Sequence, residues 1–169
     1  MTHALSRVGV VGATGAVGTR LLSILEQRNF AVSELRLFTS ARSAGRKIRA
    51  YQKDWLCEEL RSGCFDGLDV IFFDASDEVS KRWVPEALSA GCWVIDNSAV
   101  YRMDPAVPLV VPEVNGHNLG EWISAGKRLF AGPNCSTVQL TLALAALKES
   151  FALKRVVVST YQSVSGAGA

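Results

Sequence analysis

The chain has 169 residues, 49% of them hydrophobic, which is enough for one ordinary domain with a substantial core, or for one domain and the start of another. Its formal net charge of +2 is small and its basic residues form no single run, which argues against nucleic acid as a partner. No apolar run approaches the roughly 18 residues of a membrane span, and the N-terminus lacks the pattern of a signal peptide, so we expect a cytoplasmic protein with no membrane partner.

The first unit along the chain is a strand, a glycine-rich loop and a helix. Residues 7–11 form an apolar run typical of a buried parallel strand, and the loop GATGAVG follows at residues 12–18. From Val17 onward, apolar residues recur at helical spacing. Glycines spaced in this way permit a tight turn and let a pyrophosphate approach the backbone at the helix N-terminus. The string alone is weak, but its position between a strand and a helix predicts a dinucleotide site.

The second predicted strand, residues 34–39, should end near the ribose of that dinucleotide. An NAD-specific site has an Asp or Glu about 20 residues beyond the glycines, whereas residues 39–47 carry hydroxyl groups and cations instead. Arg42, with Ser40 and Ser43 donating hydrogen bonds, suits a 2′-phosphate, so NADP is favoured over NAD. The alternative is a solvated basic loop.

The middle of the chain predicts the fold class. Residues 47–68 give no clear signal. They are followed by a strand at 69–73, a helix that ends near Gly91, and a strand at 93–96. Because strand and helix alternate without hairpin signals, we predict an α/β protein with a Rossmann-like, doubly wound parallel sheet that is covered on both faces.

A loop after the strand at 93–96 carries one cation, Arg102. Its planar guanidinium is suited to a phosphate or carboxylate ligand, but an ion pair with Asp104 is an equally good interpretation. Residues 107–114, with their prolines, predict an extended segment. His117 lies in a polar turn and is interpreted as a solvated surface residue rather than a catalytic one.

The stretch AGPNCSTVQ, residues 131–139, contains the candidate nucleophile. A short strand at 129–131 precedes it and an apolar run at 138–147 follows, so Cys135 is expected in the first turn of a helix. Exposed N–H groups and the positive end of the helix dipole favour the reactive thiolate there. The alternative is one more small buried apolar residue. The four cysteines have neither a CxxC pair nor a regular spacing, so no metal site or disulfide framework is indicated.

Together, the strings GATGAVG, SARSAG, VIDNSAVYRMD, VPLVVPEVN, GPNCSTVQ and TYQSVSGAGA resemble the aspartate-β-semialdehyde dehydrogenase family in order and approximate spacing. The resemblance covers the whole chain but only about the N-terminal half of a family member. It implies an NADP-binding domain at residues 1–134, and at 135–169 the nucleophile helix and first strand, near 154–161, of an incomplete α+β catalytic and dimerisation domain.

The resemblance also implies an activity and roles for single residues. The activity is the NADPH-dependent reduction of aspartyl-4-phosphate to the semialdehyde and phosphate, on the route to lysine, methionine and threonine, in a homodimer. Cys135 would carry the acyl group as a thioester, Gln162 would act with it and contact the substrate, and Arg102 and Asn134 would bind the substrate. The implied cofactor-binding residues are Gly12, Thr14, Gly15, Ala16, Val17, Ser40, Arg42, Ser43, Ser165 and Gly166.

Two features limit what we expect of the isolated chain. Its only histidines, His3 and His117, both precede Cys135, so the acid or base that the chemistry needs is missing and we expect no turnover. The loop at 74–77 brings two carboxylates to a place where small residues are expected, which should lower the affinity for an anionic cofactor. The alternatives are a non-catalytic NADP-binding module or degenerate fragment, N-acetylglutamyl-phosphate reductase, whose cysteine context should resemble Pro-Gly-Cys-Tyr, and glyceraldehyde-3-phosphate dehydrogenase, which should have an acid after the second strand.

Overall fold

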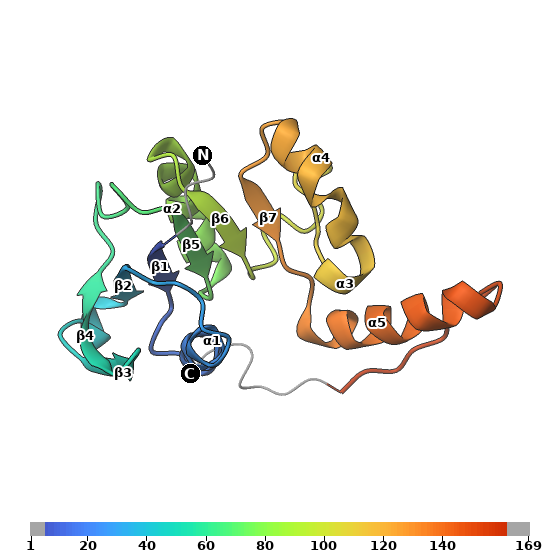
Figure 1. Cartoon of the computed structure of the whole chain (residues 1–169), viewed down its shortest axis with the longest axis horizontal. Coiled ribbons are helices and arrows are strands. Elements are labelled where there is room, and N and C mark those ends of the chain that lie inside the picture. Colours follow the sequence, from blue (N-terminus) through green and yellow to red (C-terminus); the bar gives the residue numbers. More distant parts are fainter. Residues whose placement is uncertain (1–5, 162–169) are drawn as a thin grey trace.

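A seven-stranded sheet forms the centre of the protein in a computed structural model, which describes residues 6–161 (Figure 1). The strand order is β3-β4-β2-β1-β5-β6-β7, and every neighbouring pair is parallel except β3 with β4. The strands are β1 (Arg7–Val11), β2 (Glu34–Thr39), β3 (Lys47–Ala50), β4 (Lys53–Glu59), β5 (Val70–Phe73), β6 (Trp93–Asp96) and β7 (Leu129–Ala131). The chain runs from β1 to one side through β2 and then to the other through β5, which confirms the doubly wound prediction.

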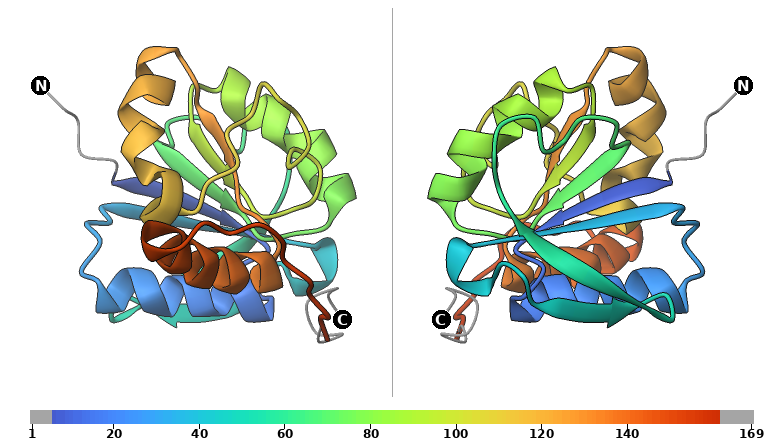
Figure 2. Two further views of the ribbon diagram at one scale, coloured as in Figure 1. Left: turned by 90° about the vertical axis from the view of Figure 1, so that its right-hand side faces the viewer. Right: turned by 90° about the vertical axis from the view of Figure 1, so that its left-hand side faces the viewer.

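Helices lie on both faces of this sheet. They are α1 (Ala16–Gln27), α2 (Asp77–Ser89), α3 (Pro112–Asn115), α4 (Leu119–Ser124) and α5 (Cys135–Ser150), with 3-10 turns at Ala41–Ser43 and Gly116–Asn118. Both views of Figure 2 show α1 on one side of the sheet and α2 on the other. In Figure 1, α5 projects beyond the sheet, and none of its residues is buried.

Strand alternation divides the core into two clusters. Val8 and Val10 of β1 belong to the cluster that contains Leu22 of α1, whereas Val11 belongs to the cluster that contains Val84 of α2. All five side chains are almost inaccessible to solvent. Burying each of them stabilises the fold by about 1.5–3 kcal/mol, and the two-sided burial explains why β1 reads as an unbroken apolar run.

The expectation of no hairpins is wrong at β3 and β4. These strands are antiparallel and are joined by Tyr51 and Gln52, whose φ angles are 51° and 60°. Two consecutive positive φ angles are the geometry of a type I′ hairpin turn, which usually carries Asn-Gly or Asp-Gly. Tyr51 packs against the cluster beneath α1, and the indole of Trp55 donates a 2.8 Å hydrogen bond to the Ala50 carbonyl. These contacts stabilise a turn that the sequence does not predict.

Two segments expected to be extended also differ. Residues 112–115 form α3, because Pro112 occupies a first-turn position where its missing N–H costs nothing. Residues 154–161 form no strand in the described structure, and all of them are exposed, including Val157 at 81%. A strand is held by hydrogen bonds to a neighbour, and this segment pairs with no strand among residues 6–161.

The ion pair between Arg7 and Asp69 makes the fold sensitive to acid. Arg7 Nη2 donates to Asp69 Oδ1 at 2.7 Å, and this contact holds the pKa of Asp69 down at about 2. Because that pKa is depressed, the stabilisation is present above the ordinary carboxyl range and is lost as pH falls towards 2. Urea unfolding at a series of pH values measures this loss. The unfolding free energy of the unchanged chain should fall steeply with pH over this range, and that of Asp69→Asn should fall less steeply. Asp66→Asn, which changes an exposed carboxyl group, should keep the steep fall.

Among the helices of residues 6–161, none combines the length and the apolarity needed to cross a bilayer.

Candidate functional site

Most of the predicted site residues follow the carboxyl ends of the parallel strands, which meet at one edge of the sheet. Among them, the loop at 12–15 follows β1, Ser40 follows β2 and Cys135 comes shortly after β7. Asp74 after β5 and Asn97 after β6, which were not predicted as site residues, lie at the same edge. β1 and β5 are neighbours whose connections leave in opposite directions, and such a switch point is where doubly wound sheets bind ligands.

The glycine loop is packed too tightly for side chains. Gly12 has a φ of +85°, and a Cβ there would collide with the carbonyl oxygen of Asp74. A Cβ on Gly18 would come within 2.5 Å of the Gly12 carbonyl oxygen. Thr14 Oγ1 lies 2.9 Å from Thr39 Oγ1, which ties the loop to the end of β2. The loop therefore leads α1 directly away from the strand edge and leaves its first N–H groups available to an anion.

The loop after β2 has the basic character expected from the sequence. Residues 41–43 form a 3-10 turn, with Ser40 before it and Arg42 exposed upon it. The ion pairs found within residues 6–161 do not include Arg42. Its guanidinium is accessible to a ligand, and its role towards a 2′-phosphate stays a prediction.

Arg102 does not pair with Asp104, so that interpretation of the sequence is wrong. Arg102 donates from Nε to the Gly132 carbonyl at 2.9 Å and from Nη2 to the Asn97 carbonyl at 2.7 Å. Asp104 instead accepts a 2.8 Å hydrogen bond from the backbone N–H of Ala106. The two carbonyl contacts hold the guanidinium between the ends of β6 and β7. One of the two carbonyls belongs to Gly132, which precedes Cys135 by three residues.

Cys135 is the first residue of α5 and is exposed, which confirms its predicted place in a helical first turn. Asn134 caps the helix, because its Oδ1 accepts from the Ser136 N–H at 3.0 Å and from the Ser136 hydroxyl at 2.6 Å. The same oxygen lies 4.0 Å from the Cys135 sulfur. The cap fixes the direction in which the helix N-terminus presents Cys135.

The other three cysteines are buried and free. Burial raises the pKa of Cys57 and Cys64, and raises that of Cys92 to about 11. Because the thiolate is the nucleophilic form, these thiols are held unreactive. Cys135 is thus the exposed thiol of the chain.

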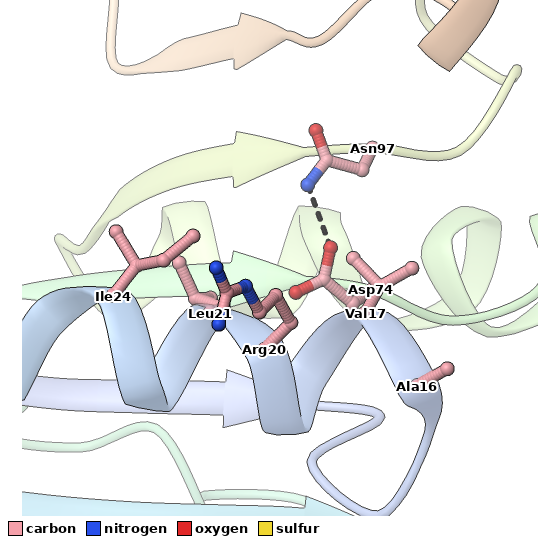
Figure 3. Close-up of a pocket in the computed structure, with 7 residues that line it drawn as sticks. All are labelled: Ala16, Val17, Arg20, Leu21, Ile24, Asp74 and Asn97. Atoms are coloured by element: carbon pink, nitrogen blue, oxygen red, sulfur yellow. Dashed lines mark hydrogen bonds between the residues drawn. The ribbon is translucent and has the colours of Figure 1, made fainter.

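A cavity of about 400 Å³ lies beside the first turns of α1 (Figure 3). It is lined by Ala16, Val17, Arg20, Leu21, Ile24, Asp74 and Asn97. Asn97 Nδ2 donates to Asp74 Oδ1 at 2.6 Å, while Asp74 Oδ2 is buried and has no hydrogen-bond partner in the described structure. Burial raises the pKa of Asp74. The sequence places this carboxylate near the ligand edge but gives no sign that one oxygen is left unpaired.

Asn97 and Gly132 are site residues that the sequence patterns do not single out. Asn97 supplies both the amide that binds Asp74 and the carbonyl that holds Arg102. A Cβ on Gly132 would collide with Asn97 Oδ1, so a larger residue there would push the Asn97 side chain aside. Only their position in the sequence could have pointed to them, since each directly follows a predicted strand.

Gln162, Ser165 and Gly166 lie outside the described residues, so their predicted roles stay predictions. Within residues 6–161, no group of three or more His, Cys, Asp or Glu side chains is arranged to hold a metal ion.

Comparison with known proteins agrees with this architecture. Residues 7–122 match the family model described as semialdehyde dehydrogenase, NAD binding domain. The chain is 48% identical to an aspartate-semialdehyde dehydrogenase of Aquifex aeolicus, over 96% of this chain and 48% of the relative. Aspartate semialdehyde dehydrogenase II of Vibrio cholerae, solved in complex with ASA, is 38% identical with a TM-score of 0.79, over 85% of this chain and 46% of that one.

The enzyme of Candida albicans, solved with NADP, is 30% identical with a TM-score of 0.67, over 87% of this chain and 48% of that one. The chain therefore spans about half the length of the curated relatives it matches. The resemblance inferred from the motifs is confirmed, and the chain belongs to the semialdehyde dehydrogenase family, whose NAD-binding domain it carries.

Proposed function

We propose that this chain is the cofactor-binding and nucleophile-bearing part of an NADPH-dependent aspartate-semialdehyde dehydrogenase, which reduces aspartyl-4-phosphate to the semialdehyde and phosphate. The observation that carries the proposal is the placement of the glycine loop, Arg102 and Cys135 along one edge of the sheet. The likeness to relatives of that name supports the substrate class. The division at residue 134, a homodimeric complete enzyme and a cytoplasmic location belong to the same proposal.

The described residues fit a dinucleotide phosphate. The space that a Cβ would fill at Gly12 and Gly18 is already taken by backbone, so the loop presents N–H groups rather than side chains. In the proposal, residues 14–17 bind the pyrophosphate, and Ser40, Arg42 and Ser43 bind the 2′-phosphate. The absence of an acid from residues 39–47 and the NADP complex of the Candida relative both favour NADP. Ser165 and Gly166 are assigned to the nicotinamide end.

Cys135 attacks the acyl carbon of the substrate as a thiolate, and the bond from that carbon to the phosphate oxygen breaks. The phosphate leaves with the bonding pair and Cys135 is left as a thioester. Arg102 and Asn134 hold the substrate during this displacement, with Gln162. Bound NADPH would supply the hydride that brings the thioester to the aldehyde level. When the aldehyde leaves, the C–S bond breaks and its electron pair returns to the sulfur.

Completion of this cycle requires a proton donor or base beside the sulfur. In the described chain, the hydrogen-bond partner of Cys135 Sγ is the amide oxygen of Asn134, which cannot transfer a proton at neutral pH. His117 is exposed on the turn before α4, and no hydrogen bond joins it to Cys135 within residues 6–161. The proposal is therefore that the chain by itself is acylated once and does not turn over.

Arg42 tests the cofactor assignment. We expect Arg42→Ala to weaken NADPH binding by roughly 10- to 100-fold, since a charge-assisted hydrogen bond contributes about 1.5–3 kcal/mol, while the weaker binding of NADH stays unchanged. Titration of the intrinsic or nicotinamide fluorescence measures both affinities. Arg28→Ala removes the same charge from the far end of α1 and should change neither. Equal losses for NADPH and NADH in Arg42→Ala would contradict the 2′-phosphate assignment.

A further inference from the structure

We propose that Asp74 contacts the bound dinucleotide and must be protonated to do so, donating a hydrogen bond from its carboxyl group to a phosphate oxygen. Cofactor binding by this chain is then coupled to the uptake of a proton and weakens as pH rises. This inference rests on the proposed function, because it needs a dinucleotide phosphate at the glycine loop.

The position of Asp74 carries the first step. Its backbone N–H donates to the Val11 carbonyl at 2.9 Å, and its own carbonyl oxygen occupies the space where a Cβ of Gly12 would lie. The residue is thus in direct backbone contact with the loop that faces the phosphates. Its side chain lines the cavity beside Ala16 and Val17, in the first turn of α1 (Figure 3). An anion at the N-terminus of α1 would therefore lie next to this carboxyl group.

The unpaired oxygen carries the second step. Oδ1 is occupied by the Asn97 amide, but Oδ2 is buried and has no partner among residues 6–161. A buried polar atom without a partner costs about 1–3 kcal/mol, and this cost is recovered when the carboxyl group turns towards the cavity, which Asp74 lines, and meets a ligand there. A carboxylate cannot pair with a phosphate oxygen because both are acceptors and both are negative. A protonated carboxyl group can, because it gains one O–H donor.

The surrounding charges decide which form is present. Burial raises the pKa of Asp74 and the nearby Asp96 raises it further, while the hydrogen bond from Asn97 opposes them. Asp96 is fully buried and is held by the hydroxyls of Ser80 and Ser98. Asp77, in the first turn of α2, is turned to the backbone N–H of Ala99 at 2.9 Å. Arg20 of α1 is the cation among the residues that line the cavity.

Phosphate binding adds further negative charge beside Asp74, so it raises the pKa of this group again. By linkage, a group whose pKa rises on binding takes up a proton, and the affinity falls as pH rises between the free and the bound pKa. The steepest fall is about tenfold for each pH unit, because one unit of pKa corresponds to a factor of ten in the binding constant.

The test measures NADP+ binding by calorimetry, from about pH 5 to about pH 9, for the 169-residue chain, Asp74→Asn and Asp77→Asn. The 2′-phosphate of NADP+ titrates near pH 6 in all three titrations, so the comparison between proteins isolates Asp74. We expect the wild-type affinity to fall by roughly tenfold more than that of Asp74→Asn across this range. The side-chain amide introduced by Asp74→Asn can donate a hydrogen bond without taking up a proton. The affinity of Asp77→Asn should depend on pH as that of the wild type does.

Equal pH slopes in the wild type and Asp74→Asn, or the same flattening in Asp77→Asn, would overturn the inference while leaving the proposed function intact. Failure of both the wild type and Asp74→Asn to bind NADP+ at any pH would instead overturn the cofactor assignment itself. Proton uptake by the wild type, measured in two buffers of different ionisation enthalpy, gives a readout that needs no variant. Uptake no greater than that of the 2′-phosphate would also overturn the inference.

Discussion

Replacing Gly12 with alanine should abolish dinucleotide binding and destabilise the chain by roughly 3 kcal/mol or more. Alanine at a φ of +85° costs about 1–2 kcal/mol in backbone conformation alone. The new Cβ would also overlap the carbonyl oxygen of Asp74 and lie 2.7 Å from its carbonyl carbon, so β5 or the loop must move. Either movement displaces the N–H groups that face the phosphates. Urea unfolding and NADPH titration measure the two effects.

Gly126 provides a matched control because it separates strain from collision. Its φ of +78° is close to that of Gly12, but a Cβ there would have no atom within 4 Å. Gly126→Ala should therefore cost only the conformational term of about 1–2 kcal/mol and should bind NADPH normally. Equal destabilisation of the two variants would mean that the loop can yield to a methyl group, which contradicts the tight packing of Gly12 against β5.

Most of the sheet could be predicted because buried parallel strands have an unmistakable local pattern. The residues proposed for β1, β2, β6 and β7 coincide with the observed strands. The β3–β4 hairpin could not be predicted, because its type I′ turn is made by Tyr51 and Gln52 rather than by residues that favour positive φ. Tertiary contacts of Tyr51 and Trp55 with the sheet, which are not local in sequence, stabilise that turn.

The site divides in the same way between local and non-local information. The glycine loop and the position of Cys135 at a helix start are local patterns, and both were predictable. The partners of Arg102 were not, since a choice between Asp104 and the strand-end carbonyls depends on how β6 and β7 lie side by side. The unpaired oxygen of Asp74 is likewise a result of packing between α1, β5 and Asn97.

Helix α5 shows a limit of another kind. Its residues are mostly apolar, yet none is buried, and α3 is the element it contacts most. The sequence predicts that such a run is helical, but burial depends on what packs against it. The assignment of residues 135–169 to a second domain accounts for these exposed side chains and stays a prediction. The same reasoning applies to the exposed valines at 156–158.

Exposure of the thiol at a capped helix start implies a single, selective acylation. Mixing the chain with aspartyl phosphate should add one aspartyl group to Cys135 and release one equivalent of phosphate. The other cysteines should stay unmodified, because burial raises their pKa values. Intact-mass and peptide-mass analysis locate the adduct, and a phosphate assay gives the stoichiometry. Cys135→Ser should abolish both signals, whereas Cys64→Ser should retain them.

With NADPH present, sustained cofactor oxidation would contradict the proposal that the chain lacks the proton-transfer group for turnover. Acylation spread over buried cysteines would contradict the role of Cys135 as the nucleophile.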